Sequence, residues 1–369
     1  MKIIVSSNTA WSIDIFRLNL LIFLHKKGYE INIIAPEDKK YKKKFQSLGF
    51  KFFTLPEVTN KISIYKDFKL LLSYLYYFIT IKPNIFLGFT IKPNIYGSII
   101  TRLMNIKTIN NITGLGRVYA LENFTTKFIN FLYKISLSKS YCIYFQNKHD
   151  QNYFIKKKII HSKNYDLLPG SGVDLKKFRQ IKYYPREERN LNFLYCSRLI
   201  TEKGIIDYLS LAKKIKNKYN NIHFNIIGAY DDSTKKIIEK KILKYSNSKI
   251  VNFYGFQEDV RSYIAKCDCL IFPSNYREGF PKIIIETMSI GRPIICNSFP
   301  SCDTYISDKN NAIINFENNL EGLINKTEYF INLNDDYKIK LSINARNTAE
   351  IFFDDKFIIN KYYSLISRL

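Results

Sequence analysis

Long hydrophobic runs and the common metal-binding spacings are both missing from this chain of 369 residues. Its longest charge-free apolar run, residues 70–81, has twelve residues, which is too few to span a bilayer. The six cysteines form no CxxC pair and no regular framework, which favours reduced thiols in the cytosol. None of the four histidines lies in a spacing such as HExxH, so we expect no protein-held metal and no cofactor.

Two glycine-rich nucleotide motifs are missing as well. Neither half of the chain carries GxGxxG after its first strand, and GxxxxGK[ST] does not occur. The turn after the first strand, Ser6–Ser12, is small and polar instead. A dinucleotide oxidoreductase and a P-loop nucleotidase are therefore disfavoured. Residues 1–6 have the pattern of a first strand rather than of a signal peptide.

Acidic residues are few relative to basic ones, and the net charge is +25. Residues 1–175 hold 26 Lys and Arg against 10 Asp and Glu, a net of +16, and the remaining 31 and 22 give +9. This excess predicts an anionic partner, which could be nucleic acid, an acidic membrane surface or a phosphorylated ligand. A compositional bias toward lysine, isoleucine and asparagine explains it equally well, so charge alone does not decide.

Strand patterns alternate with helical patterns in two successive series, which predicts an α/β fold of parallel βαβ units. The first series has expected strands at residues 2–6, 31–35, 51–54, 84–87, 107–111, 142–145 and 165–168. The second has them at 191–197, 222–227, 250–253, 269–272, 294–297 and 312–314. A chain of this length, with 46% hydrophobic residues, is expected to form two domains.

A break between the two series contains Gly170, Gly172, Pro185 and the charged run 186–189. We therefore predict an N-terminal domain over residues 1–172, a linker over 173–190, a C-terminal domain over 191–350 and a final helix over 351–369. One expected helix, near residues 66–81, is apolar nearly all round. It is either buried or lies in a membrane interface.

The most informative stretch is Phe272–Met288, where an apolar strand leads through a polar loop into a helix. Glu278 and Glu286 stand eight residues apart there, and Gly291 is expected to end the helix. In an open α/β sheet, ligands bind at this edge. The two carboxylates could be an acid/base pair, ligands for sugar hydroxyls, or a capping acid and a surface acid.

A second loop, between the first strand and first helix of the second series, carries Arg198 and Lys203. Two cations beside a helix N-terminus suit a diphosphate, although both could simply be solvated surface residues. Combined with the carboxylates Glu278 and Glu286, they favour a ligand with a phosphate and a polyol. In the first series, Asn111–Gly116 is either a ligand loop or a tight turn, and its spacing leaves both possibilities open.

Several of these motifs together resemble the retaining GT-B glycosyltransferases of family 4. They are Glu278–Pro281 followed by Glu286, the loop Ser197–Gly204, and Gly170–Asp174 with Phe178. Three further stretches, Phe89–Gly97, Asn111–Gly116 and Phe145–Asp150, are similar to a narrower group. Enzymes of that group extend undecaprenyl-diphosphate-linked sugars for O-antigen, capsule or N-glycan precursors. The resemblance covers essentially the whole chain, although Ser7–Ser12 replaces a loop that is commonly glycine-rich.

The resemblance implies two Rossmann-like domains facing across a cleft, with the C-terminal helix crossing back onto the first. It implies that Arg198 and Lys203 hold the donor diphosphate, that Glu286 holds the ribose hydroxyls, and that Glu278 lies beside the transferred sugar. Glu278, Arg198 and Lys203 would be the catalytic residues. The implied donor site also includes Gly228, Gly279, Phe280 and Pro281. The implied acceptor site includes Ser12, Arg17, Thr113, Gly114 and Gly116.

The implied activity is transfer of a hexose or N-acetylhexosamine from a UDP-sugar, with UDP-GalNAc or UDP-GlcNAc as leading donors. The acceptor would be a polyprenyl-diphosphate-linked saccharide, and the enzyme would be cytoplasmic and peripheral on the anionic inner membrane face. A GDP-sugar or a soluble acceptor is the alternative within the family. A basic nucleic-acid-binding protein is the alternative outside it, but that hypothesis leaves the ordered motifs unexplained, so we expect no nucleic acid partner.

Overall fold

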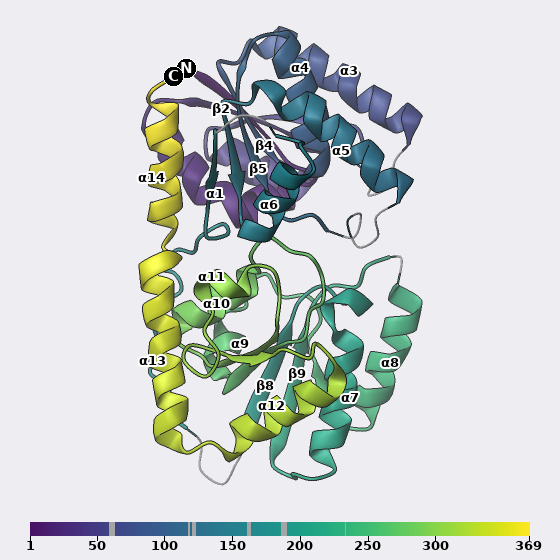
Figure 1. Ribbon diagram of the computed structural model, residues 1–369, viewed down its shortest axis with the longest axis vertical. Coiled ribbons are helices and arrows are strands. Elements are labelled where there is room, and N and C mark those ends of the chain that lie inside the picture. Colours follow the sequence, from purple (N-terminus) through teal and green to yellow (C-terminus); the bar gives the residue numbers. More distant parts are fainter. Residues whose placement is uncertain (59–62, 117–118, 120–122, 161–163, 186–189, 233) are drawn as a thin grey trace. The chain divides into compact units, whose positions relative to one another are not determined.

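In a computed structural model, the described residues are 1–58, 63–116, 119, 123–160, 164–185, 190–232 and 234–369. The charged run 186–189 of the predicted linker lies outside them. The chain divides into two compact units. Unit 1 comprises Met1–Gly172, Arg277–Phe280 and Asp355–Leu369, and unit 2 comprises Val173–Tyr276 and Pro281–Asp354. Each unit contains its own sheet (Figure 1).

Unit 1 is built on a seven-stranded sheet of order β3-β2-β1-β4-β5-β6-β7, in which all neighbours are parallel. Its strands are β1 (Lys2–Ser6), β2 (Glu30–Pro36), β3 (Lys51–Leu55), β4 (Ile85–Phe89), β5 (Lys107–Ile112), β6 (Cys142–Phe145) and β7 (Tyr165–Leu167). The order reverses direction beside β1, as in Rossmann-like sheets. Ligands of such sheets bind where the order reverses, at the carboxyl ends of the strands.

The helices of unit 1 connect successive strands. They are α1 (Ala10–Lys26), α2 (Lys39–Ser47), α3 (Ile64–Ile81), the π-helix η1 (Pro93–Gly97), α4 (Ser98–Leu103), α5 (Phe124–Ser136), the 3₁₀ turn η3 (Leu137–Lys139) and α6 (Lys148–Lys156), together with α14 (Asp355–Ile366). Side chains cap several of them. Thr9 accepts a hydrogen bond from the Ser12 N–H at the start of α1, and Asn147 accepts one from the Asp150 N–H at the start of α6.

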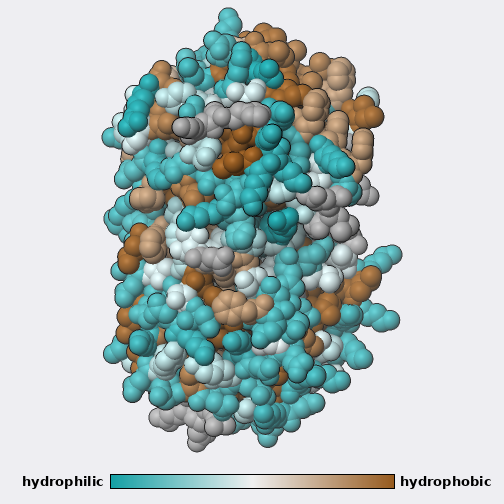
Figure 2. Space-filling view, in the orientation of Figure 1, coloured by the Kyte–Doolittle hydropathy of each residue, from teal (hydrophilic) through white to brown (hydrophobic). Residues whose placement is uncertain are grey.

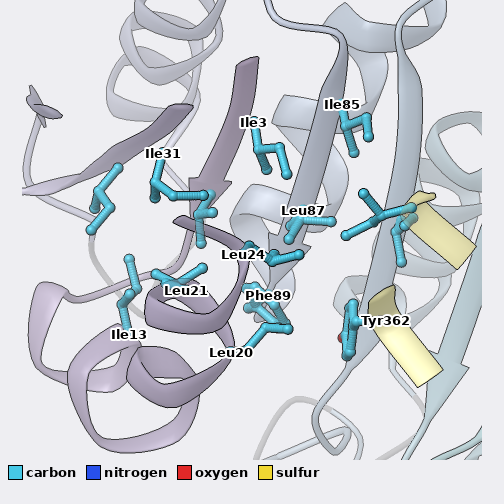
Figure 3. Close-up of a cluster of buried hydrophobic side chains, with 14 of the residues drawn as sticks. Ile3, Ile13, Leu20, Leu21, Leu24, Ile31, Ile85, Leu87, Phe89 and Tyr362 are labelled. Carbon is cyan, nitrogen blue, oxygen red and sulfur yellow. The ribbon is translucent and has the colours of Figure 1, made fainter. Parts of the chain in front are cut away.

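The main core of unit 1 lies between α1, the strands and α14 (Figure 3). The last helix contributes Ile358, Tyr362 and Ile366, which recur every four residues and therefore lie on one face. They join Leu20 of α1 and Leu87 of β4 in one buried cluster. Helix α14 thus completes the core of unit 1, although it is the last element of the chain.

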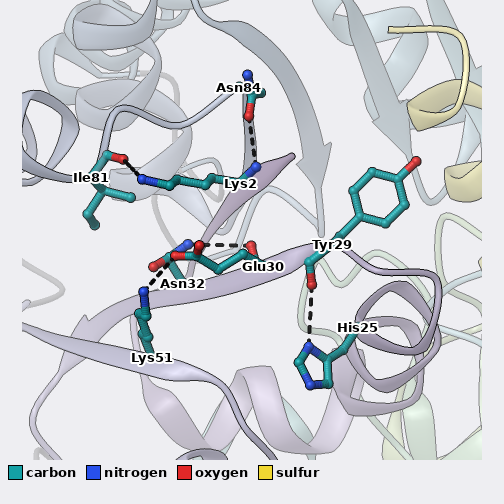
Figure 4. A network of polar contacts seen from close by, with 8 residues as sticks. All are labelled: Lys2, His25, Tyr29, Glu30, Asn32, Lys51, Ile81 and Asn84. Carbon is teal, nitrogen blue, oxygen red and sulfur yellow. Dashed lines mark hydrogen bonds and ion pairs between the residues drawn. The ribbon is translucent and has the colours of Figure 1, made fainter.

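A polar network closes the amino-terminal edge of this sheet (Figure 4). The backbone N–H of Lys2 donates to the Asn84 side chain at 2.7 Å, and its ammonium donates to the carbonyl of Ile81 at 3.1 Å. Lys51 donates to the Glu30 carboxylate at 3.0 Å, which lowers the pKa of that carboxyl. The polar groups at this edge are therefore bonded to one another, and the opposite, carboxyl edge is where the predicted site residues stand.

Unit 2 is built on a six-stranded parallel sheet of order β10-β9-β8-β11-β12-β13. Its strands are β8 (Leu191–Cys196), β9 (Ile222–Ile227), β10 (Asn252–Phe253), β11 (Cys269–Phe272), β12 (Ile294–Asn297) and β13 (Ile313–Asn315). Its helices are η5 (Thr201–Lys203), α7 (Ile205–Lys216), α8 (Lys235–Asn247), α9 (Arg261–Lys266), α10 (Lys282–Ile290), α11 (Cys302–Tyr305), α12 (Leu320–Asn332) and α13 (Asp335–Phe352).

The two parallel sheets with surrounding helices confirm the predicted α/β class. Pro281 is the N-cap of α10, and Gly291 ends that helix at φ 76°, as expected. Helices α12 and α13 were not predicted.

Helix α3 is the apolar helix for which burial and a membrane interface were both considered. Burial explains the apolar residues of only one of its faces, because Leu70, Tyr74 and Phe78 are buried while the opposite face is exposed. Across the described residues, the helices are all too short or too polar to cross a membrane.

Candidate functional site

In unit 2, the loop that carries Arg198 and Lys203 follows β8 and is held against the end of β11. Gly204 lies in the left-handed region, at φ 75°, and a Cβ there would lie 2.0 Å from the Pro273 carbonyl oxygen. Only glycine permits both this conformation and this approach. The Asn275 N–H also donates to the Glu202 carbonyl at 2.9 Å. The loops after two neighbouring strands are thereby joined.

Both cations of the loop converge on one aromatic ring. The Arg198 guanidinium carbon lies 5.4 Å from the centroid of the Tyr276 ring, and the Lys203 ammonium lies 5.0 Å from it. The hydroxyl of Tyr195 donates toward the carbonyls of Arg198 and Lys203 at 3.2 Å, which holds the backbone of the loop in place. The structure therefore brings together the two cations that the sequence placed five residues apart.

Lys203 is 6% exposed, whereas Arg198 is exposed. Burial lowers the pKa of the Lys203 ammonium well below its ordinary value, and the nearby positive charge of Arg198 lowers it further. A bound anion would counter both effects, because its negative charge would stabilise the buried ammonium and screen the two cations from each other. The arrangement is suited to a phosphate or diphosphate.

Glu286 projects from α10 and is half-buried. Burial raises the pKa of its carboxyl to about 7, and the cation of Lys282 opposes this shift. Burial raises the pKa of the Cys196 thiol at the end of β8, and the charge of Glu286 raises it further, so the carboxylate lies near the carboxyl end of that strand. Gly228, after β9, is packed so closely that a Cβ would lie 2.0 Å from the Ser197 carbonyl oxygen. Glu286 and Gly228 thus both border β8.

The four residues Arg277–Phe280 belong to unit 1, and they are bound to the loop after β5. The Gly279 N–H donates to the Thr113 carbonyl at 3.1 Å, and the Gly116 N–H donates to the Arg277 carbonyl at 2.9 Å. Gly114 lies between them at φ 116°, and a Cβ there would lie 2.4 Å from the Gly279 nitrogen. Thr113, Gly114 and Gly116 therefore cradle the backbone around Glu278.

The end of β6 provides a second set of bonds to the same four residues. The Gln146 side-chain oxygen accepts a hydrogen bond from the Phe280 N–H at 3.3 Å. The Asn147 amide donates toward the carbonyls of Glu278 and Gly279 at 3.4 Å each. Since Asn147 is also the N-cap of α6, its amide orientation is fixed by the helix. Sequence reasoning did not assign Gln146 and Asn147 to the site.

Ser12 and Arg17 both lie on α1 but on different faces, since five residues correspond to about 140° around a helix. The Ser12 hydroxyl contacts that of Ser7 at 2.7 Å and donates to the Thr9 carbonyl at 2.8 Å. Arg17 is 4% exposed and lies on the buried face, with its guanidinium carbon 4.3 Å from the Phe89 centroid. Burial lowers the pKa of this guanidinium. The two predicted acceptor residues thus do not share a surface.

A polar chain in unit 1 links the last helix to the loop around Glu278. The Asn111 amide donates to the Tyr362 hydroxyl at 2.9 Å, and Gln146 donates to the Asn111 side-chain oxygen at 3.3 Å. Gln146 in turn accepts from Phe280. All four residues are buried. Within the described part of the chain, no three His, Cys, Asp or Glu side chains cluster as metal ligands would.

Two family models match the chain, one over each series of strands. The model described as "Glycosyl transferase 4-like" matches residues 2–147, and the model "Glycosyl transferases group 1" matches residues 176–348. Together they include the loops around Arg198, Lys203, Glu278 and Glu286.

Two curated relatives are similar over most of their length. One is the N,N'-diacetylbacillosaminyl-diphospho-undecaprenol alpha-1,3-N-acetylgalactosaminyltransferase of Campylobacter jejuni, 25% identical over 100% of this chain and 99% of the relative. Another is the Escherichia coli UDP-Gal:alpha-D-GlcNAc-diphosphoundecaprenol alpha-1,3-galactosyltransferase, 23% identical over 88% and 85%. Among solved structures, Anabaena Alr3699/HepE in complex with UDP and glucose has a TM-score of 0.80 at 14% identity, with both chains covered fully.

Proposed function

Because this chain belongs to the GT-B glycosyltransferases of family 4, we propose that it is a retaining hexosyltransferase of bacterial surface-polysaccharide synthesis. Its donor is a UDP-sugar, with UDP-GalNAc or UDP-GlcNAc as the leading candidates, and its acceptor is an undecaprenyl-diphosphate-linked saccharide. The relative from Campylobacter jejuni, similar over the full length, supports this acceptor class. The observation that carries the proposal is the convergence of Arg198 and Lys203 on Tyr276.

In this proposal the diphosphate of the donor lies against Arg198 and Lys203, close to the first turn of α7. The two cations neutralise the charge that develops on UDP as the bond to the sugar breaks, which is electrostatic stabilisation of the leaving group. Lys203 is held in a buried position before the donor arrives, so little reorganisation is needed. A buried cation also interacts more strongly with a phosphate than an exposed one does.

Glu278 and the backbone of Gly279–Pro281 contact the transferred sugar in this proposal. The bond between the anomeric carbon and the UDP oxygen breaks, and the acceptor hydroxyl oxygen bonds to that carbon from the same face. The hydroxyl proton passes to the departing phosphate oxygen, so no side chain needs to become covalently attached. Glu278 then positions sugar hydroxyls, a role for which a carboxylate is suited because it accepts several hydrogen bonds.

The acceptor saccharide binds in unit 1, near the loop Thr113–Gly116 that holds Glu278. A lipid-linked acceptor places the enzyme at the inner face of the cytoplasmic membrane as a peripheral protein. The basic balance of residues 1–175 supports this, since it favours contact with anionic lipid and with the acceptor's diphosphate.

The test of the proposed function is a donor panel. Purified protein is incubated with UDP-GalNAc, UDP-GlcNAc, UDP-galactose, UDP-glucose and a GDP-sugar, each with short-chain polyprenyl-diphosphate saccharides, and products are analysed by mass spectrometry and NMR. We expect transfer from one UDP-sugar and an axial, donor-like anomeric linkage in the product. Transfer from the GDP-sugar alone, or an inverted linkage, would contradict the proposal.

Donor binding is expected to strengthen as the pH rises through about 7, which is the pKa that burial gives Glu286. Below this pH the carboxyl is protonated and one oxygen no longer accepts from the ribose hydroxyls. Above it the carboxylate accepts from both. Calorimetric affinity for a UDP-sugar, whose diphosphate does not titrate in this range, should therefore increase up to about tenfold between pH 6 and pH 8. Glu286→Gln should bind weakly with no such pH dependence, and an unchanged profile in this variant would exclude Glu286 as the titrating group.

A further inference from the structure

Helix α3 presents a continuous stripe of large apolar side chains to solvent. Its exposed members are Ile64, Tyr65, Phe68, Leu72, Tyr76 and Ile79. At 100° per residue they fall within an arc of about 120°, and the buried residues of the same helix lie on the other side. Ile64 is 88% exposed and Phe68 is 59% exposed. A helix of a water-facing surface would carry polar residues on this arc.

Helix α5 carries a second stripe of the same kind. Phe124, Phe128 and Phe131 recur at spacings of four and three, so they share one face, and Phe124 is 83% exposed. Leu103 at the end of α4 is 76% exposed. Helix α4 packs against both α3 and α5 (Figure 1). Figure 2 shows hydrophobic side chains gathered at the upper right, over this part of unit 1. We call the exposed apolar residues of α3, α4 and α5 the α3–α5 face.

The charges on these three helices are almost all positive. Lys69 on α3 and Lys127 and Lys134 on α5 are exposed. Asp67 is the only acidic residue among the described residues of α3, α4 and α5, and its side chain is buried and forms an ion pair with Lys92 at 2.6 Å. Exposed aromatic residues flanked by lysines are the pattern of a surface that enters the headgroup region of an anionic bilayer.

We propose that the α3–α5 face is the surface by which this protein docks onto an anionic lipid membrane, with its aromatic side chains in the headgroup region. A second copy of the chain fits less well, because a symmetric contact would place the lysines of one copy against those of the other. Membrane docking would serve sugar transfer only if the acceptor is lipid-linked, so the role of this face rests on the proposed function. The binding itself can be measured without any transfer.

The test compares two triple variants that change the charge equally. The first variant combines Phe68→Glu, Leu72→Glu and Phe131→Glu, which interrupt the apolar stripes of α3 and α5. The unit 2 variant combines Ile237→Glu, Leu243→Glu and Phe256→Glu, which replace exposed apolar residues of unit 2, two of them on the lysine-rich helix α8. All six side chains are exposed, so both variants should keep their secondary structure and midpoint of thermal unfolding.

Binding is measured by co-sedimentation with vesicles of phosphatidylcholine alone and with phosphatidylglycerol added. We expect the natural protein to bind the anionic vesicles, the first variant to lose about tenfold or more in partition coefficient, and the unit 2 variant to bind within about twofold of the natural protein. Equal loss in both variants, or binding that does not depend on phosphatidylglycerol, would overturn the proposal.

Transfer assays then separate this inference from the proposed function. With a short-chain acceptor that is soluble in water, the first variant should match the natural protein. With a long-chain acceptor embedded in anionic vesicles, it should be slower by the same factor as its loss of binding. If the natural protein transfers no sugar to any acceptor, the proposed function fails, while the vesicle experiment still tests membrane docking by the α3–α5 face. If the first variant is as active as the natural protein on the embedded acceptor, only the proposed docking by this face is contradicted.

Discussion

Lys203→Met should lower kcat/KM for sugar transfer by about a thousandfold, since one preorganised group that stabilises developing charge contributes on that order. Methionine keeps most of the length and the apolar contacts of the buried side chain, so the change removes mainly the charge. The ammonium lies 5.0 Å from the Tyr276 centroid and is buried, so its proposed interaction with a departing diphosphate would be strong. Steady-state kinetics with the identified donor measure the effect.

Lys213→Met is the matched control, because Lys213 is an exposed lysine on the adjacent helix α7. It should retain activity within about twofold, in keeping with the small effects of surface substitutions. Lys203→Met should keep the fold, because removing a buried charge does not cost packing. A Lys203→Met enzyme within threefold of the natural one would show that the diphosphate lies elsewhere.

Much of the loop that carries Arg198 and Lys203 could be predicted from sequence because its determinants are local. Arg198 and Lys203 follow the first strand of a βαβ unit, and the carboxyl ends of parallel strands are where ligands bind. Tyr276 could not be predicted as their partner. It is 73 residues from Lys203 along the chain, and its approach depends on the contact between Gly204 and Pro273. No spacing rule encodes a contact between loops of different strands.

Burial was harder to predict than element type. The pattern of α3 correctly indicated a helix, but an apolar sequence does not reveal which face a neighbouring sheet covers. Half of that helix packs on β4 side chains such as Phe86, and the other half is exposed. Arg17 shows the opposite case. Arginine side chains are mostly exposed in folded proteins, whereas Arg17 lies over the Phe89 ring within the core. Both outcomes depend on tertiary packing.

The contacts that hold the Glu278 loop could not be predicted from the sequence either. Gln146 and Asn147 follow β6, and their amides bond to a backbone more than 130 residues away. Asn147 could be predicted as a helix cap from its position before α6. Its second contact, with the carbonyls of Glu278 and Gly279, depends on the fold of unit 1 as a whole.

Glu278→Ala should abolish detectable transfer, a loss of at least a thousandfold in kcat, while leaving the affinity for UDP within about threefold. The reason is that the proposed contact of this carboxylate is with the sugar, whereas the proposed contacts of Arg198, Lys203 and Glu286 are with the nucleotide. Calorimetry with UDP and kinetics with the UDP-sugar separate the two effects. Equal losses in UDP affinity and in transfer would instead show that the loop has moved as a whole.

Gln146→Ala provides the comparison that decides between these explanations. It leaves the carboxylate in place but removes the acceptor that fixes the Phe280 N–H. If the loop's position matters, this variant should lose on the order of tenfold to a hundredfold in kcat, because small misplacements of a positioning group cost that much. Activity should be partly restored by Gln146→Glu, whose carboxylate can still accept from the N–H. A Gln146→Ala enzyme with full activity would mean that Glu278 needs no support from β6, and a fully active Glu278→Ala enzyme would remove that carboxylate from the reaction.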